Sequence, residues 1–597
     1  MPTLPLFLAS MALAQAPAGA PEQKPYFEQE VKYRIEALLD DEAEVLHGRA
    51  RVRYTNRSPD ALDTLYFHLY LNAFRPNSAW ARRDLEFGER RFQDLGPDEW
   101  AYERLKSVVV DGAEVTPRYP GAPDSTVVAI PLAEPLGPGE SVRVDLDWDA
   151  RPSTLPRRQG RRGRHYDFAQ WFPIVAVYDR WGWEAHPLLP QGEFYGEFMD
   201  FDVTLDVAAD QVIGATGVPV EGDPGWEAAA APGYADSLYY KRDAYGDVGA
   251  AESLGLLAAR AQPGRKRVRW MAEDVHNFAW STSPDYIYEG GRWGDVAIHV
   301  LYQPGDTAWA RGQALRNTKT ALEWLDSIYG PFAWPQITNL HRIESGGTEF
   351  PMMVMNGGAS LSLILHEVGH NYTMGILANN EWKQGFLDEG FTSFQTNWYF
   401  QTHGRPDVWD RTFERMAEWE RAGMSQPLIM ESADFRDFRT YNTMTYTKPS
   451  IVYRMLQGYL GDAAFREGLR RYYRENRLNH VTLADFQAAM EAASGQELDW
   501  FFDQWFRTTR TLDYAIRSAT TTRRADGSWE TRVEVERTGE AWMPVTLEVA
   551  GVRKVLDSRE RIQTVAVVTP ERPDAVVLDP DTAVLETDRS NNRRAVE

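Results

Sequence analysis

The hydrophobic period of this chain changes along its length, and this change limits the folds that the chain can adopt. Between residues 26 and 293 apolar and polar residues alternate, for example over 142–148 and 201–207. Alternation of this kind is typical of half-buried antiparallel strands. Clusters of Pro, Gly and Asp such as 222–225 separate these runs and indicate turns. We therefore predict a large N-terminal all-β domain over residues 25–292.

A helical period replaces the alternation after this domain. Leu315, Leu322 and Leu325 fall on one stripe of a helix, and a Gly-Pro pair ends it. A short strand over 337–343 follows, and the sequence after it is mostly helical. We predict a mostly helical domain over residues 293–510.

The two-residue period returns over residues 511–597. Asp526 and Gly527 lie between two alternating runs, and the alternation continues up to Val549. This length suits a small C-terminal β-sandwich. The whole chain is therefore predicted to be a multidomain α+β protein.

The N-terminus contains a short apolar run followed by small residues. We expect a signal peptide over residues 1–18 and an exported protein, either periplasmic or extracellular. Cleavage after Ala14 or Ala18 would leave a small residue at the required positions. The alternative is an apolar tail on a cytosolic protein. No other window approaches 18 uninterrupted apolar residues, so we expect no stable membrane span.

Composition excludes several classes of partner and of chemistry. The chain has 64 Lys and Arg against 87 Asp and Glu, a formal net charge of −23, which argues against nucleic acid or an anionic membrane as the main partner. Cysteine is absent, so thiol catalysis, disulfides and Cys-ligated metals are excluded. Any metal must be bound by His, Asp or Glu.

The predicted helical domain contains a His-Glu-x-x-His motif, His366 to His370. Residues four apart lie on one side of an α-helix, so both imidazoles can reach one ion, with Glu367 beside them. Apolar neighbours such as Leu365 indicate a buried helix, on which two unpaired histidines would be costly. Glu389 supplies a third ligand from the next predicted helix. The motif predicts a Zn²⁺ site with one position open to water.

These four residues, with 18 residues between the second histidine and the last glutamate, resemble the signature of the M1 family (gluzincins) of zinc aminopeptidases. The resemblance covers nearly the whole chain and implies a thermolysin-like catalytic domain over residues 293–510. It also implies one Zn²⁺ per chain, bound by His366, His370 and Glu389. The similarity is to bacterial members, and we expect no counterpart of the long C-terminal helical-repeat domain of four-domain members.

Two further segments carry the resemblance. Gly346, Gly347 and Glu349 lie where the family has a Gly-x-Met-Glu-Asn strand, whose glutamate binds the α-ammonium of the substrate. Thr348 and Phe350 replace the Met and Asn of that motif, so the wall of the first specificity pocket is altered. The resemblance nevertheless implies that Gly346, Gly347 and Glu349 bind substrate.

The second segment surrounds Tyr446, which precedes Lys448 and a predicted helix start. In the family a tyrosine at this place faces the tetrahedral intermediate. Pro449 replaces a family glycine, which the first turn of a helix tolerates. Tyr446 is therefore expected to be catalytic, although a core aromatic residue would be the simpler interpretation without the helix context.

The chemistry of the predicted site follows from these residue types. Zn²⁺ lowers the pKa of a water molecule toward neutrality. Glu367 can take the proton of that water and pass it to the departing amine. We therefore predict a zinc-dependent aminopeptidase that acts on peptides with a free N-terminus.

Two other functions are compatible with the same sequence. The protein could be an endopeptidase or another zinc hydrolase in which Glu349 binds no amine. It could also be a non-catalytic peptide-binding protein, but such a protein has no chemical reason to keep the metal ligands, Glu367 and Tyr446 together. The sequence assigns no role to Glu193, and it specifies neither the preferred N-terminal residue nor the oligomeric state. The arginine run over 157–164 is interpreted as an exposed loop, and a contact for acidic substrates or a partner is the less favoured alternative.

Overall fold

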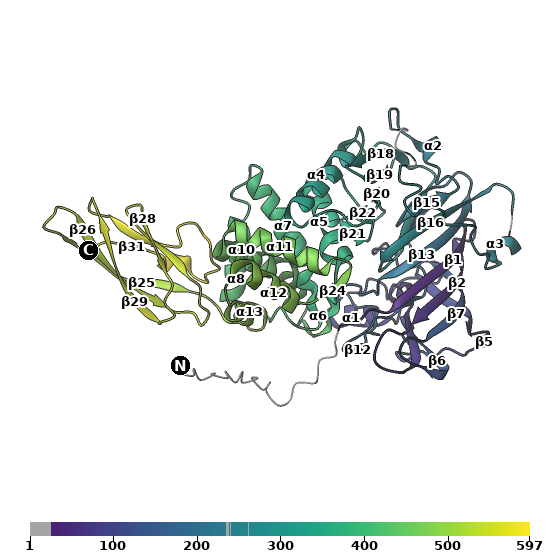
Figure 1. Ribbon diagram of the computed structural model, residues 1–597, viewed down its shortest axis with the longest axis horizontal. Coiled ribbons are helices and arrows are strands. Elements are labelled where there is room, and N and C mark those ends of the chain that lie inside the picture. The colour runs from purple at the N-terminus through teal and green to yellow at the C-terminus, as the bar shows by residue number, and fades with distance from the viewer. Residues whose placement is uncertain (1–25, 235–237, 239, 261) are drawn as a thin grey trace, which may run out of the picture.

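A computed structural model describes residues 26–234, 238, 240–260 and 262–597 (Figure 1). The predicted signal peptide, residues 1–18, lies outside these residues. Three regions follow one another along the long axis: a β-rich region at one end, a helical region in the middle and a β-sandwich at the other end. The predicted multidomain α+β fold class is confirmed.

The β-rich region is built on an eight-stranded sheet. Strands β1 and β13 pair in parallel, and every other neighbouring pair in this sheet is antiparallel. Burial alternates along β7, with Val142, Val144 and Leu146 buried and their neighbours more exposed, as the two-residue period predicts. In spatial order the strands are β15 (Val218–Glu221), β16 (Arg265–Val275), β13 (Met199–Ala208), β1 (Glu30–Asp40), β2 (Val45–Thr55), β7 (Ser141–Arg151), β4 (Tyr102–Val110) and β5 (Ala113–Glu114).

Smaller sheets and short helices complete this region. One of the sheets contains β8, which follows directly on the loop 152–159. This loop becomes important at the candidate site. The sheets are β10 (Ile174–Val175) with β3 (Leu62–His68) and β6 (Val127–Leu136); β14 (Val212–Ala215) with β17 (Trp280–Ser283), β9 (His165–Phe168) and β8 (Gly160–Arg162); and β11 (Tyr178–Asp179) with β12 (Gly182–Trp183). The helices are η1 (Tyr70–Ala73), α1 (Ala79–Glu86), α2 (Trp226–Ala229) and α3 (Leu256–Ala259).

The middle region begins with a five-stranded sheet. Its spatial order is β18 (Ile287–Trp293), β19 (Val296–Tyr302), β20 (Gln336–His341), β22 (Met353–Asn356) and β21 (Gly347–Phe350). Strand β21 is one of the two edge strands and pairs antiparallel with β22. The predicted boundary between residues 292 and 293 falls inside β18, which pairs with β19, so the strand belongs to this sheet. The domain limits otherwise remain predictions.

Helices form the rest of the middle region, and two of them carry the motif residues. Helix α5 starts after Ser360, whose hydroxyl accepts a hydrogen bond from the Leu363 N–H at 3.2 Å. Helix α7 starts at Glu389. Among the described residues, no helix is long and apolar enough to cross a membrane. The helices are α4 (Gln313–Ile328), α5 (Leu361–His370), α6 (Glu381–Gln384), η4 (Gly385–Leu387), α7 (Glu389–Thr402), α8 (Asp410–Arg421), η5 (Ser432–Asp434), α9 (Phe438–Asn442), α10 (Lys448–Leu460), α11 (Asp462–Asn476), α12 (Leu483–Ser494) and α13 (Asp499–Phe506).

Two π-helical segments interrupt this succession, η3 (Asn371–Ile376) and η6 (Thr443–Thr447). The first directly follows the His-Glu-x-x-His motif and leads into a short parallel pair of strands, β23 (Leu377–Asn379) and β24 (Asn479–Val481). The second carries Tyr446. Such π segments are frequent at functional sites, because they rotate a side chain out of the regular helical register.

The C-terminal region is the predicted sandwich. Two antiparallel sheets bury alternating residues such as Val545, Leu547 and Val549 between them. One sheet contains β25 (Tyr514–Arg523), β26 (Trp529–Arg537) and β29 (Ile562–Thr569). The other contains β28 (Val552–Leu556), β27 (Val545–Val549), β30 (Ala575–Leu578) and β31 (Arg593–Ala595), with η7 (Arg589–Asn591) before the last strand.

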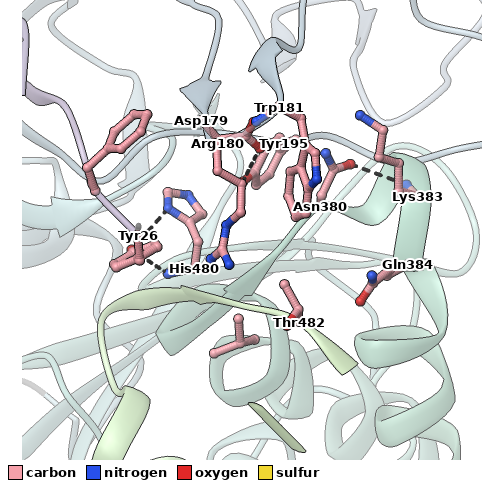
Figure 2. Close-up of a pocket in the computed structure, with 12 residues that line it drawn as sticks. Tyr26, Asp179, Arg180, Trp181, Tyr195, Asn380, Lys383, Gln384, His480 and Thr482 are labelled. Atoms are coloured by element: carbon pink, nitrogen blue, oxygen red, sulfur yellow. Dashed lines mark hydrogen bonds between the residues drawn. The ribbon is translucent and has the colours of Figure 1, made fainter. Parts of the chain in front are cut away.

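Polar contacts join the β-rich region to the middle region near a small cavity of about 50 Å³ (Figure 2). The His480 backbone N–H donates to the hydroxyl of Tyr26 at 2.8 Å. The His480 ring donates from Nε2 to the carbonyl of Gly196 at 2.9 Å. The cavity shares no lining residue with the candidate site described below, so it is a feature of the junction and not of the site.

A buried ion pair holds α10, the helix that follows Tyr446, against α8. The Lys448 ammonium lies 2.9 Å from Glu420, and both side chains are at most 3% exposed. Two buried charges stabilise a fold only as a pair, because each alone would carry the full cost of lost hydration.

Replacing Lys448 with Met should therefore destabilise the protein by about 3–5 kcal/mol, because Glu420 is left buried without a partner. Denaturant unfolding of the single variant and of Lys448→Met combined with Glu420→Leu measures this. The double variant should recover most of the loss. A single variant as stable as the unmodified protein would contradict a structural role for the pair.

Candidate active site

Helix α5 places the two motif histidines around one carboxylate oxygen. His366 Nε2 lies 3.2 Å and His370 Nε2 lies 3.4 Å from Oε2 of Glu389. The ligand atoms of these three residues all lie within 4.8 Å of one another. The sequence predicted that these three residues bind one metal ion. In the structure their ligand atoms do lie close together.

These three residues fit a zinc ion. Ligand atoms about 2.0–2.2 Å from a tetrahedral Zn²⁺ lie roughly 3.3–3.5 Å from one another, which matches the two distances. Oε2 of Glu389 is buried and has no hydrogen-bond donor among the described residues, so it is left for a cation. Burial also lowers the pKa of His366, which favours the neutral imidazole that a metal requires.

Contacts behind the ligands hold them in position. The carboxylate of Asp388 lies 2.6 Å from His370 Nδ1 and is fully buried, so Nε2 is the nitrogen that faces Glu389. Burial is the largest single influence on His370 and by itself would lower its pKa. The nearby charges, of which Asp388 is the strongest, outweigh it and raise the pKa. The hydroxyl of Tyr446 donates a hydrogen bond to the second oxygen of Glu389. Asp388 precedes Glu389 directly in the chain, a signal that the sequence analysis did not use.

The edge strand β21 passes so close to α5 that a side chain is excluded at one position. A Cβ atom added at Gly347 would lie 2.0 Å from Cδ of Glu367. Only glycine therefore lets this strand lie against the Glu367 carboxylate. Gly346, the residue before it, has a φ of 76°, which glycine adopts without strain.

Glu367 itself is 4% exposed, and its Oε2 accepts no hydrogen bond within the part of the chain that the structure describes. Burial raises its pKa to about 7. A carboxyl group with a pKa near neutrality can both take up and release a proton.

All these residues except Asp388, which lies behind His370, line one cavity of about 300 Å³ between the β-rich and middle regions. It contains every site residue that the sequence predicted, together with residues that it did not. The lining residues are Arg157, Arg158, Pro190, Glu193, Arg342, Glu344, Gly346, Gly347, Thr348, Glu349, Leu363, His366, Glu367, His370, Glu389, Phe438, Tyr441 and Tyr446.

Two residues of the β-rich region lie in this cavity, and the sequence gave neither of them a role in the site. Glu193 is 5% exposed, and one of its carboxylate oxygens lies within 4.8 Å of oxygens of Glu349 and Glu389. Arg158 forms ion pairs with Glu193 and Glu349. The interpretation of 157–164 as an exposed loop is therefore wrong for Arg158, because contacts with the middle region cover it.

The site combines a buried His-Glu-x-x-His helix with a carboxylate from the next long helix and a sheet edge beside them. This combination is typical of zinc metallopeptidases. Residues 355–505 match the family model of the peptidase family M1 domain. This match supports the resemblance to the M1 family that the sequence predicted.

Named relatives agree with this assignment. The chain is 31% identical over 165 residues to aminopeptidase N of Haemophilus influenzae, which covers 26% of this chain and 18% of the relative. It is 25% identical over 262 residues to aminopeptidase N of Caulobacter vibrioides, which covers 39% of this chain and 29% of the relative. The matches thus span less than a third of the length of these curated relatives.

Solved structures share the fold. Aminopeptidase A of Legionella pneumophila matches with a TM-score of 0.62 at 14% identity, over 94% of this chain and 59% of that one. An M1 zinc metallopeptidase of Deinococcus radiodurans matches with a TM-score of 0.53 at 15% identity, over 81% of this chain and 94% of that one.

Replacing Asp388 with Ala should weaken zinc binding by about 10- to 100-fold, because His370 loses the partner that orients it. Competition with a chelator measures the affinity. Asp485→Ala serves as the control, because Asp485 caps α12 in a capping box and belongs to no metal-ligand cluster among the described residues. An unchanged zinc affinity in the Asp388 variant would contradict the orienting role.

Proposed function

We propose that the protein is a zinc-dependent aminopeptidase that removes residues from the N-termini of peptides. One observation carries the proposal. The carboxylates of Glu193 and Glu349 lie within 4.8 Å of the carboxylate of Glu389, beside the two imidazoles. A free α-ammonium bound by this carboxylate pair would bring the first peptide bond of the substrate next to the metal ligands.

Zinc fits the set His366, His370 and Glu389, and we propose one ion per chain at this site. When bound, zinc supplies a Lewis acid that polarises a carbonyl and lowers the pKa of a water molecule. The chain itself supplies the proton transfers and the positioning.

Glu367 is the proposed general base. Its unpartnered, buried Oε2 can accept the proton of an attacking water, and the carboxyl can then donate it to the leaving nitrogen. The absence of a side chain at Gly347 keeps β21 close enough to present a peptide beside this carboxylate.

Glu349 is the proposed amine anchor, and the backbone of Gly346 and Gly347 is proposed to lie along the substrate. Glu349 is 9% exposed and lies at the edge of the five-stranded sheet. An ion pair there is partly shielded from water and hence stronger than on the surface.

Tyr446 is the proposed donor to the carbonyl oxygen of the scissile bond. Its ring lies nearly parallel to that of His366, at 11° with centroids 6.2 Å apart, and its hydroxyl points into the ligand cluster. A neutral donor there would stabilise negative charge that develops on the carbonyl oxygen.

Export is a further part of the proposal. Its support is the apolar run and small residues within 1–18. Sequencing the N-terminus of the protein recovered from outside the cytoplasm tests it, and an intact residue 1 there would contradict cleavage.

Replacing Glu367 with Gln should lower turnover at least ~100-fold while zinc stays bound, because the amide keeps the shape but cannot accept a proton. Steady-state kinetics and metal analysis on the same preparation measure both. Glu414→Gln on the exposed face of α8 is the matched control and should keep full activity. Loss of zinc in the Glu367 variant would place this residue among the ligands instead.

Free peptides should be cleaved at least ~10-fold faster than the same peptides with an acetylated N-terminus, because acetylation removes the charge that Glu349 binds. Glu349→Gln should reduce this difference without changing the zinc content. Rates on paired substrates measure it. Equal rates on both forms in the unmodified protein would instead favour the endopeptidase alternative.

A further inference from the structure

The β-rich region inserts one cation, Arg158, into the candidate amine site. Its loop, 152–159, is fixed to the middle region by Glu344. One oxygen of that carboxylate accepts from the Arg158 backbone N–H at 2.7 Å, and the other accepts from Arg157 at 3.3 Å. Arg158 has a φ of 60°, a conformation that these contacts stabilise. The guanidinium is therefore held in place and is not a freely moving surface group.

The guanidinium of Arg158 contacts both carboxylates of the amine site. Nη2 forms a close ion pair with Glu193, and Nη1 lies 3.5 Å from Glu349. Its Cζ lies 5.3 Å from the ring centroid of Phe194. The pair with Glu193 is the tighter one, so Glu349 keeps more of its capacity to accept hydrogen bonds from an ammonium group. Only some of the five N–H donors of an arginine are used by these contacts.

Charges in the cavity wall are balanced before a substrate enters. The lining contains three arginines (Arg157, Arg158, Arg342) and, apart from Glu367 and Glu389 at the proposed metal site, three glutamates (Glu193, Glu344, Glu349). Zn²⁺ would balance the two metal-site carboxylates. An entering α-ammonium therefore adds a positive charge to a wall whose arginines and glutamates are already matched in number. The buried carboxylates of Glu381 and Asp388 lie behind Glu349, within 4.8 Å of its own, and compensate part of that charge. A carboxylate on the same substrate residue would restore the balance, and a second cation would worsen it.

We propose that Arg158 determines the preferred N-terminal residue, binding the side-chain carboxylate of an N-terminal Asp or Glu and disfavouring Lys or Arg. The inference rests on the proposed function, because it assumes that Glu349 binds the α-ammonium. The side chain and the α-ammonium of the first residue are bonded to the same Cα atom. In Asp or Glu the side-chain carboxylate is therefore separated from that Cα by only one or two methylene groups. Arg158 is the cation that contacts Glu349 among the described residues, so this carboxylate reaches it first.

The test compares p-nitroanilides of Glu, Gln and Lys with the zinc-loaded full chain. The unmodified protein should prefer Glu over Gln and Gln over Lys in kcat/KM. In Arg158→Gln the ratio of Glu to Gln should fall about tenfold or more, as expected for a lost charge-assisted hydrogen bond, and the ratio of Lys to Gln should rise. Arg158→Lys should keep part of the preference for Glu.

Arg164→Gln is the matched control from the same arginine run. Arg164 is 41% exposed, pairs with Asp41 and Asp210 and does not line the cavity, so its variant should keep the substrate ratios. Zinc content and thermal stability of each variant exclude misfolding as the cause of a change. Unchanged ratios in Arg158→Gln, or an equal loss on all three substrates, would overturn the proposal.

Binding of free amino acids separates this inference from the proposed function. If the zinc-loaded protein cleaves none of the amides, the aminopeptidase proposal fails. Arg158 is then tested by thermal shift, in which L-glutamate should stabilise the unmodified protein more than L-lysine, and Arg158→Gln should remove the difference. Equal shifts with both amino acids in the unmodified protein would overturn the inference by itself.

Discussion

The burial of Glu389 between two imidazoles is the constraint on which the rest of the site depends. A carboxylate that is 3% exposed and lies 3.2 and 3.4 Å from two ring nitrogens is costly unless a cation compensates it. Burial, together with the nearby charges of Asp388 and Glu349, raises its pKa to about 8 although His370 lowers it. Asp388 orients His370, and Tyr446 orients Glu389, so each holds one ligand in the position that a metal ion requires.

The site also depends on the contact between two regions of the chain. The middle region supplies the metal ligands, Glu367 and Glu349, whereas the β-rich region supplies Arg158 and Glu193. Glu344 joins them, because it accepts hydrogen bonds from the loop 152–159 while it lies beside β21. In the proposed enzyme, the metal chemistry would therefore be a property of one region and the choice of substrate a property of both.

The burial of each element decides how clearly its sequence predicts it. Strand β7 was predicted because one of its faces is buried and the other is more exposed, which produces a two-residue period. Strand β19 is buried on both faces, so its sequence carries no alternation and the strand was missed. The predicted boundary between residues 292 and 293 falls within β18, which pairs with β19.

The sequence by itself determined the local chemistry of the site. Four-residue spacing on a helix places His366 and His370 on one side for any buried α5, and the need for a third ligand pointed to Glu389. The family resemblance added Glu349 and Tyr446. Only the tertiary structure decided what Arg158 does. Arg158 lies 191 residues from Glu349 in the chain. It belongs to a basic run that the sequence alone favours as an exposed loop. No local period encodes a contact over that distance, because it depends on how the β-rich and middle regions pack together.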